Sequence, residues 1–444
     1  MSLLSLQTDQ GYGDLGCFGS ETVKTPYIDQ MAKEGAILSS FYVPAAVCTP
    51  SRAGLLTGCY AQRVNMFGVL ISGSKRGLNP DEITMAEVAK SAGYHTAMFG
   101  KWHLGDQPQF LPTRQGFDEF FGLPYSHDIH PHNPWLKKHP NKQFPPLPLL
   151  EGEKVIEAEP NADYLTKRIT EKAVDFIKRK KKDPFLLYVA HPLPHRPLHM
   201  SPSFMEKVPQ DFRDKINDYE KDGKGIDYTT RDKIYPYAIN EIDWSVGQIL
   251  EALKKQGIDK NTLVLFTSDN GPDGPVKSSA GPLRGHKGST FEGGMREPTV
   301  VRWPAKIKAG QNIKELMTTM DILPTLVHLL NYSIPDNRVI DGKNILPTLT
   351  ENAPSPHDYF FYHGRRGVLE AVRHGDWKLH IKEDKATALY NLEKDIGESE
   401  DLLNEHPKMA AELLEVCKNF SKELKAKSRD WGWLSIEETK VLAK

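Results

Sequence analysis

The chain alternates short apolar runs with stretches of helical periodicity, and this alternation restricts its fold more than any other feature. Apolar runs of strand length stand at residues 3–6, 95–99, 185–190 and 262–268. Helical patterns stand between them at residues 84–94, 165–177 and 239–253. The first of these begins with Thr84 and Glu87, which are spaced for a capping box. Repeated helix–strand units predict an α/β fold with a mainly parallel sheet flanked by helices.

Three regions interrupt the alternation. Residues 105–160 are rich in Pro, His and Asn, and residues 195–232 are also irregular, so we expect both to form walls of a cleft. After about residue 350, short strands with tight Gly/Asp turns precede an amphipathic helix near 407–425. This texture predicts a small antiparallel sheet with one helix. We place the boundary near Pro354, between a large domain of residues 1–353 and a smaller α+β subdomain of residues 354–444.

The overall charge and the apolar runs exclude several classes of partner. The 444 residues carry a formal net charge of −1, so no global field attracts nucleic acid or an anionic membrane. No run of 18 apolar residues exists, so we expect no membrane span. The four cysteines are too sparse for a disulfide framework, although one bridge remains open. The first residues lack a signal peptide, so the protein is either cytoplasmic or a mature chain whose leader is absent.

Chemically competent side chains follow four of the predicted strands. They are Asp9 and Gln10, Lys101 and His103, His191 and His195, and Asp269 and Asn270. Ligands of open α/β sheets bind outside the carboxyl ends of the strands, so we expect these four segments to meet at one cleft.

The oxygen donors in this set suit a hard cation. Asp9, Asp269 and Asn270, with Gln10 as a fourth candidate, predict a Ca²⁺ site, with Mg²⁺ as the alternative. Further cationic or proton-donating side chains accompany them at Arg52, Lys101, His103 and Lys287. Together the two groups describe a site for an oxyanion polarised by a divalent metal.

Cys48 stands in the segment AAVCTPSRAGLLTG, residues 45–58. Pro50 suits the first turn of a helix, which places Cys48 at the N-terminus, where the helix dipole favours an anion. The residues alone leave two interpretations open, a thiolate nucleophile of low pKa or a small buried hydrophobe. The C-x3-R spacing to Arg52 is two residues too short for a C-x5-R phosphate loop.

The segment CTPSRAGLLTG resembles the type I sulfatase signature C-x-P-S-R-x-x-x-L-T-G at every specified position, and GKWHLG resembles the second signature. The similarity continues through GYGDLGCFG, FTSDNGP and LRGHKGSTFEGGMREP and covers essentially the whole chain. The resemblance implies an alkaline-phosphatase-like fold and a sulfuric ester hydrolase of the branch that contains arylsulfatase A and N-acetylgalactosamine-6-sulfatase.

In that family a formylglycine-generating enzyme oxidises the signature cysteine, here Cys48, to Cα-formylglycine. One hydroxyl of the hydrated aldehyde attacks sulfur, and the other later expels the sulfate. The resemblance implies that Arg52, Lys101 and the metal hold the hydrate and that His103 accepts its proton. It further implies that His195, rather than His191, protonates the leaving alcohol. The remaining implied roles are sulfate contacts by Lys287 and Ser126.

The chain departs from the family at Thr8, where the first of two adjacent metal-binding aspartates is usual. The Thr8 hydroxyl, the Gln10 amide oxygen or a water could fill that place; otherwise the site is one carboxylate short and weaker for Ca²⁺.

The expected substrate is a sulfated saccharide of the galactose or N-acetylgalactosamine type. Trp135 would stack on a sugar ring, and Arg365 and Arg366 would pair with a second anionic group. Two alternatives are a phosphomonoester or phosphonate monoester hydrolase of the same fold and a silent carbohydrate-binding relative. The expected location is the periplasm, the exterior or the lysosome, with the cytoplasm as the alternative.

Overall fold

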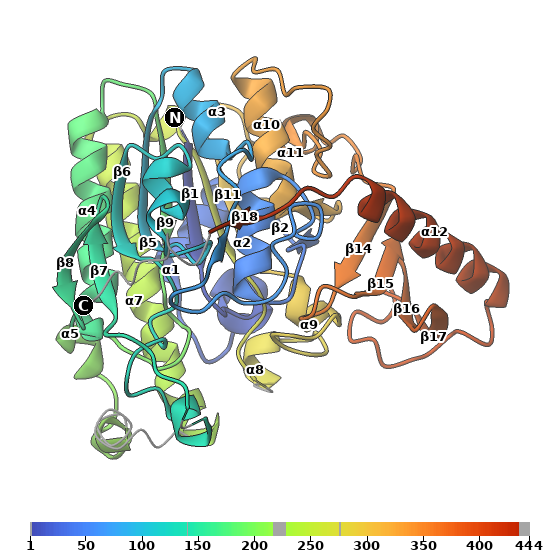
Figure 1. Ribbon diagram of the computed structural model, residues 1–444, viewed down its shortest axis with the longest axis horizontal. Helices are drawn as coiled ribbons and strands as arrows, with labels where there is room; N and C mark the ends of the chain where they lie inside the picture. The colour runs from blue at the N-terminus through green and yellow to red at the C-terminus, as the bar shows by residue number, and fades with distance from the viewer. Residues whose placement is uncertain (1, 140, 216–227, 275–276, 435–444) are drawn as a thin grey trace.

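A computed structural model describes residues 2–139, 141–215, 228–274 and 277–434 (Figure 1). Its centre is a ten-stranded sheet with the order β12-β2-β11-β10-β1-β9-β5-β6-β7-β8. In chain order the strands are β1 Ser2–Gln7, β2 Ala36–Leu38, β5 His95–Lys101, β6 Glu119–Leu123, β7 Pro148–Glu151, β8 Lys154–Ala158, β9 Phe185–Ala190, β10 Leu263–Ser268, β11 Thr299–Arg302 and β12 Gln311–Ile313.

The middle of the sheet is parallel, as the helix–strand alternation predicts. Strands β10, β1, β9, β5 and β6 all run in one direction, with Leu4 of β1 opposite Leu265 of β10 and Tyr188 of β9. Antiparallel pairs occur only toward the two edges, at β10–β11, β11–β2, β6–β7 and β7–β8. The four predicted strands are therefore neighbours, which brings their carboxyl ends together.

Helices cover both faces of the sheet, and the side chains of β9 show why. Leu187 and Val189 enter one hydrophobic core, whereas Leu186 and Tyr188 enter the other. The first core is closed by α1 Pro26–Glu34, α4 Leu165–Lys180 and α7 Tyr228–Lys255. The second is closed by α2 Cys48–Thr57, α3 Met85–Ser91 and α10 Ile322–Leu329. Figure 1 shows α4 and α7 on one side of the sheet and α2, α3 and α10 on the other.

The expectation of an irregular segment at 105–160 is wrong in part. It contributes three strands, β6, β7 and β8, to one edge of the sheet. The apolar face of β6 is short, and β8 is largely exposed, so neither carries the long apolar run that marks a buried strand. The part between β6 and β7 is irregular and lines a cleft, as expected. Of the second irregular stretch, residues 216–227 lie outside the described residues.

The C-terminal part is an antiparallel sheet covered by one helix, as the sequence predicts. It comprises β14 Tyr359–His363, β15 Leu369–His374, β16 Trp377–Lys382, β17 Lys385–Asn391 and α12 Pro407–Ala426. After α12 the chain returns to the larger part, where β18 Gly432–Trp433 pairs with β4 Arg76–Gly77. The boundary near Pro354, between α11 Leu346–Glu351 and β14, stays a prediction.

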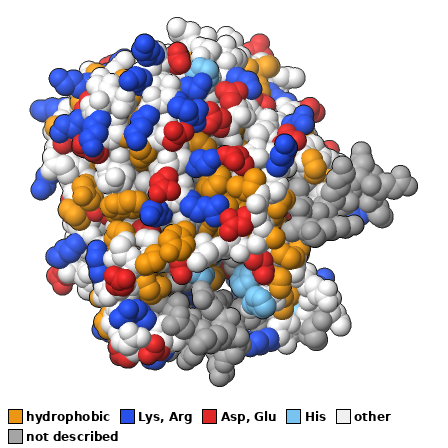
Figure 2. All heavy atoms as spheres, turned by 90° about the vertical axis from the view of Figure 1, so that its left-hand side faces the viewer, with side chains coloured by type: hydrophobic (Ala, Val, Ile, Leu, Met, Phe, Trp, Pro, Cys, Tyr) orange, Lys and Arg blue, Asp and Glu red, His pale blue; other side chains and the backbone are white. Residues whose placement is uncertain are grey.

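All four cysteines, Cys17, Cys48, Cys59 and Cys417, are free thiols. Among the described residues, no helix is both long and apolar enough to cross a membrane. On the face shown in Figure 2, lysines and arginines alternate with acidic side chains, so this face presents no continuous patch of one sign.

Candidate active site

The predicted site residues gather at the carboxyl end of four adjacent strands. Asp9 follows β1, Lys101 ends β5, His195 follows β9, and Asp269 follows β10. The sheet order β10-β1-β9-β5 makes these four strands consecutive. The convergence that the sequence predicts is therefore a direct consequence of parallel strand pairing.

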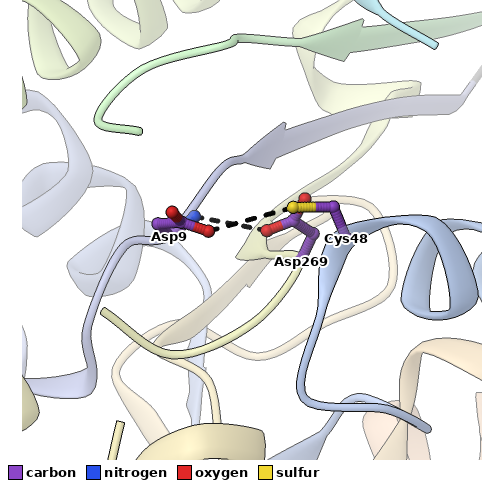
Figure 3. Close-up of side chains that lie close together, drawn as sticks. All are labelled: Asp9, Cys48 and Asp269. Atoms are coloured by element: carbon purple, nitrogen blue, oxygen red, sulfur yellow. Dashed lines mark hydrogen bonds between the residues drawn. The ribbon is translucent and has the colours of Figure 1, made fainter. Parts of the chain in front are cut away.

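Helix α2 presents Cys48 to this edge. Val47 has extended backbone and precedes the helix, and Gly58 ends it in the left-handed conformation, with φ 67°. Cys48 is 2% exposed, and its thiol lies 4.0 Å from Oδ1 of Asp9. Figure 3 shows Cys48, Asp9 and Asp269 converging from the start of α2 and from the ends of β1 and β10.

The structure opposes a reactive thiolate at Cys48. Burial raises the pKa of the thiol, and the negative charge of Asp269 raises it further. Lys101 and Lys287 lower the pKa but do not outweigh these effects. The helix N-terminus alone would favour an anion, so here desolvation dominates the dipole.

Arg52 is buried one turn into α2 and joins three strands through its guanidinium. It donates to Oδ2 of Asp269 from Nε at 3.0 Å and from Nη2 at 2.8 Å, and to the Lys101 carbonyl at 2.7 Å. The same Nη2 donates to the hydroxyl of Thr8 at 2.8 Å, and that hydroxyl donates to the His191 carbonyl at 2.8 Å. Thr8 therefore supports Arg52 and offers the site no carboxylate.

Asp9, Asp269 and Asn270 offer oxygen atoms suited to a hard cation. Within the part of the chain that the structure describes, Asp9, Cys48 and Asp269 form a buried cluster whose ligand atoms all lie within 4.8 Å of one another. Asn270 donates from Nδ2 to Oδ1 of Asp9 at 2.7 Å, which leaves its own Oδ1 buried without a partner. Carboxylates with an orphaned buried amide oxygen fit a divalent ion, because such an oxygen otherwise costs free energy.

Gln10 remains a candidate ligand. Its side chain is fully buried, and neither its amide oxygen nor its amide nitrogen has a hydrogen-bond partner. Its backbone is fixed, because its N–H donates to the Ser268 hydroxyl at 3.0 Å.

Lys101 and His103 supply a buried cation and a base. The Nζ of Lys101 is buried without a hydrogen-bond partner. His103, with φ 65°, has Nε2 2.9 Å from the Leu70 carbonyl, which fixes the proton on Nε2 and leaves Nδ1 as an acceptor. Burial, and then the positive charge of Lys101, hold the pKa of His103 well below its usual value.

His195 and Lys287 lie near Oδ2 of Asp9, whereas Cys48 and Asn270 lie near Oδ1. The Nζ of Lys287 pairs with Oδ2 of Asp9 at 2.8 Å, and Nε2 of His195 lies 3.6 Å from the same oxygen. Burial would lower the pKa of Lys287, but Asp9 outweighs it and raises that pKa. His191 instead contacts the Ser245 hydroxyl inside the core at 2.9 Å, whereas His195 lines the cleft; the catalytic role of His195 stays a prediction.

A cleft of about 1200 Å³ opens above these groups. Its lining contains Cys48, His103, His195 and Lys287, together with the predicted substrate-binding residues Ser126, Trp135, Arg365 and Arg366. The Ser126 hydroxyl is buried without a hydrogen-bond partner. All the predicted substrate contacts therefore face the same space as Cys48.

Two further acidic residues that were not predicted from the sequence, Asp128 and Asp273, also line the cleft. Oδ1 of Asp128 lies 4.0 Å from Nδ1 of His195. Burial would raise the pKa of Asp128, but His195 and His127 lower it to about 2. Asp273 pairs with Arg196. Asp128 stands two residues after Ser126 in YSHD, and this short distance in the sequence could have indicated that it belongs to the cleft.

Comparisons with known proteins identify the family of the chain. The profile described as "Sulfatase" matches residues 3–332, and a profile described as "N-sulphoglucosamine sulphohydrolase, C-terminal" matches residues 286–430. Human arylsulfatase A is 35% identical over 94% of this chain and 86% of its own length. Human N-acetylgalactosamine-6-sulfatase is 36% identical over 85% of this chain and 71% of its own.

Solved structures show the same fold. A structure described as Ps i-CgsB in complex with k-i-k-neocarrahexaose superposes with a TM-score of 0.81 and 30% identity, over 98% of this chain and 95% of its own. The phosphonate monoester hydrolase of Agrobacterium radiobacter superposes with a TM-score of 0.66 and 21% identity, over 96% of each chain, which shows the fold alone. The alkaline-phosphatase-like α/β fold is confirmed. The chain belongs to the sulfatase family and is a sulfuric ester hydrolase.

Proposed function

We propose that this sulfatase hydrolyses sulfate esters of carbohydrates, with Cys48 oxidised to Cα-formylglycine and a divalent cation, Ca²⁺ or Mg²⁺, held by Asp9, Asp269 and Asn270. The observation that carries the proposal is the position of Cys48. It stands at the N-terminus of α2, 4.0 Å from Asp9, and lines the same cleft as His195 and Lys287.

Formylglycine would supply a hydrated aldehyde, which offers one oxygen for attack on sulfur and a second for release of the sulfate. The maturation partner would be a formylglycine-generating enzyme that reads the Cys, Pro and Arg of the CTPSR segment. The surroundings of Cys48 support this use. The N-terminus of α2, which has no side-chain cap, would favour an anion on the hydrate, and Asp269 holds Arg52 in place.

The bound cation would polarise the oxyanion as a Lewis acid. Asp9 and Asp269 provide its carboxylates, Asn270 provides an amide oxygen that otherwise lacks a partner, and Gln10 is the fourth candidate. Thr8 supports Arg52 rather than adding a third carboxylate. The site thus suits a hard cation with two carboxylates among its candidate ligands.

We assign the two proton transfers to His103 and His195. His103 keeps its proton on Nε2 toward the Leu70 carbonyl, so Nδ1 is free to accept a proton from the Cys48 side. His195 has Nδ1 2.5 Å from the Arg196 carbonyl, so its neutral ring carries the proton on Nδ1 and Nε2 must gain a proton before it can protonate the leaving alcohol. Burial, and then the positive charge of Lys287, hold the pKa of His195 well below its usual value, whereas the protonated ring is the form that the leaving step requires. Lys101 and Lys287 bring positive charge to the sulfate oxygens, and Ser126 offers a buried hydroxyl.

The expected sugar is of the galactose or N-acetylgalactosamine type. The names of the curated relatives and the carrageenan oligosaccharide in the solved relative support this class. Trp135 and the arginines at 365 and 366 line the cleft and suit an anionic sugar chain.

A sulfate-release screen tests the proposal. The substrates are 6-sulfated and 4-sulfated N-acetylgalactosamine, sulfated galactosides, glucosamine sulfates, 4-nitrophenyl sulfate, and matching phosphate and phosphonate esters. We expect hydrolysis of a sulfated galactose-type sugar, a poor rate with the aryl sulfate, and no turnover by Cys48→Ala. Rapid turnover of glucosamine sulfates alone would overturn the sugar class, and rapid turnover of phosphonates alone would overturn the substrate class. A chain inert toward every ester would indicate a binding relative.

A further inference from the structure

The segment that follows α12 is fixed against the rim of the cleft. Its strand β18 pairs with β4, with Gly432 opposite Gly77 and Trp433 opposite Arg76. Both glycines lie against Phe110, where an added Cβ would come within 2.3 Å of the ring. Arg429 anchors the segment through two hydrogen bonds to Glu82, at 2.8 and 2.9 Å. The backbone before and within β18 is therefore held in one position.

Trp431, just before β18, and Trp433, within it, extend a row of aromatic side chains. The rings of Phe67 and Trp431 lie 6.0 Å apart, and those of Trp431 and Trp433 lie 6.2 Å apart and stacked, at 26°. The Arg76 guanidinium lies 4.5 Å from the Trp431 ring. Trp433 is 61% exposed, although its backbone is fixed. A rigid indole facing water offers a flat apolar surface to the ring of a sugar.

The aromatic row continues the wall of the catalytic cleft. Phe67 and Arg76 line the cleft, as do Arg365 and Arg366. The turn that carries these two arginines packs on Phe67, because Gly367 lies close enough that an added Cβ would be 2.9 Å from Phe67 Cβ. One wall thus leads from this turn, past Phe67 and Arg76, to Trp431 and Trp433.

The charge of this wall is positive and unneutralised. Within the described part of the chain, Arg76, Arg365 and Arg366 make no ion pair, whereas the protein as a whole has a net charge of −1. The cleft of about 1200 Å³ also exceeds the upper end, roughly 1000 Å³, of sites for drug-sized ligands. Both features suit an anionic chain longer than one sugar unit.

We propose that Phe67, Arg76, Trp431 and Trp433 form a distal subsite for a pyranose that carries an anionic group, sulfate or carboxylate. This sugar lies further along the same saccharide chain than the unit that loses its sulfate. The inference rests on the proposed function, because the chain enters the subsite from the catalytic cleft. It implies that oligosaccharides are better substrates than monosaccharides.

Binding to the inactive Cys48→Ala protein tests the subsite by calorimetry, without turnover. The ligands are a chondroitin 6-sulfate tetrasaccharide, a carrageenan tetrasaccharide and 6-sulfated N-acetylgalactosamine. We expect at least one tetrasaccharide to bind more tightly than the monosaccharide. Trp433→Ala should weaken that binding about tenfold, whereas Trp433→Phe should retain most of it. Arg76→Gln should weaken the anionic tetrasaccharide more than its desulfated form. Tyr27→Ala, an exposed aromatic at the start of α1, is the matched control.

The outcomes separate this inference from the proposed function. If the enzyme hydrolyses a monosaccharide sulfate but binds neither tetrasaccharide more tightly, the subsite is wrong and the function stands. Equal tetrasaccharide affinity of the Cys48→Ala protein with and without the Trp433→Ala substitution also overturns the subsite. If no saccharide sulfate is hydrolysed but Trp433→Ala weakens tetrasaccharide binding, the subsite stands and the function falls.

Discussion

The carboxylate of Asp9 lies at the centre of the site's polar contacts. Its carboxylate accepts from Asn270 and Lys287 and lies 4.0 Å from the Cys48 thiol, and Nε2 of His195 is 3.6 Å away. Its backbone is in the left-handed conformation, with φ 64°, which is uncommon for a residue other than glycine. Such local strain is retained where the surrounding structure needs the side chain in one direction.

At this scale we predict metal dependence through Asp269. Chelation should abolish activity, and added Ca²⁺ or Mg²⁺ should restore it. Asp269→Asn keeps the size of the side chain but removes a charge, so it should lower kcat/KM by about two orders of magnitude and weaken Ca²⁺ binding in calorimetry. Asp183→Asn, at an exposed site, is the control. An Asp269→Asn protein with normal activity and no bound metal would contradict the assignment.

At the scale of elements, hydrophobic period and turn chemistry predicted four adjacent strands of the ten-stranded central sheet, β10, β1, β9 and β5. Strand β9 and helix α12 coincide with their expected ranges, and Thr84 caps α3 through the expected capping box. The other six strands, β2, β6, β7, β8, β11 and β12, escaped prediction, because their pairing toward the sheet edges depends on tertiary contacts rather than on a long apolar run. The sequence likewise predicted the convergence of Asp9, Lys101, His195 and Asp269. Asp128 was missed although it stands two residues after Ser126, whereas the return of β18 to β4 could not be predicted, since these strands are far apart in the chain.

The turn between β14 and β15 leads to a prediction about selectivity. Arg365→Ala or Arg366→Ala should lower the ratio of kcat/KM for a sulfated tetrasaccharide to that for 4-nitrophenyl sulfate. We expect about a three- to fivefold change, because an exposed ion pair contributes up to about 1 kcal/mol. Lys385→Ala, exposed on β17 of the same sheet, should leave the ratio unchanged. An unchanged ratio in both arginine variants would remove these residues from substrate binding.

Helix α7 leads to a prediction about pH. Glu241 is buried and accepts from the Ser201 N–H, at 2.9 Å, and burial raises its pKa to about 7. The folded protein thus binds this proton more tightly than the unfolded chain, so stability is lost as the pH rises through about 7. Between about pH 5.5 and pH 8.5 this group should lower the free energy of unfolding by about 2 kcal/mol.

Urea unfolding at the two pH values measures this effect. Glu241→Gln should remove that part of the pH dependence, whereas Glu251→Gln, at an exposed position of α7, should retain it. An identical pH dependence in wild type and Glu241→Gln would show that Glu241 titrates alike in both states.

At the scale of the whole molecule, a buried charge cluster joins the C-terminal sheet to the cleft. Lys378 of β16 pairs with Glu292 and Glu398, both at 2.9 Å, and all three side chains are fully buried. Burial would raise the pKa of Glu292, but Lys378 outweighs it and lowers that pKa. Glu398 also accepts from the Glu292 N–H at 2.6 Å and so holds the segment that follows Lys287.

Loss of this lysine should therefore affect stability and the site together. Lys378→Met removes the cation that Glu292 and Glu398 share and leaves Glu292 its longer ion pair with Arg296, at 3.3 Å, so we expect the free energy of unfolding to fall by about 3–5 kcal/mol. Lys382→Met, exposed on the same strand, should change it by less than about 0.5 kcal/mol. Urea unfolding measures both, and similar effects of the two substitutions would show that the cluster does not hold the parts together.

The state of Cys48 in active enzyme tests the central claim most directly. Mass spectrometry of the peptide that carries Cys48, with hydrazide capture of its aldehyde, gives the fraction of chains converted to formylglycine. Preparations made with and without a formylglycine-generating enzyme should differ in this fraction. We expect the specific rate of sulfate release to rise in proportion to it and to vanish when every Cys48 is a thiol. Full activity in protein whose Cys48 is entirely unmodified would contradict the account.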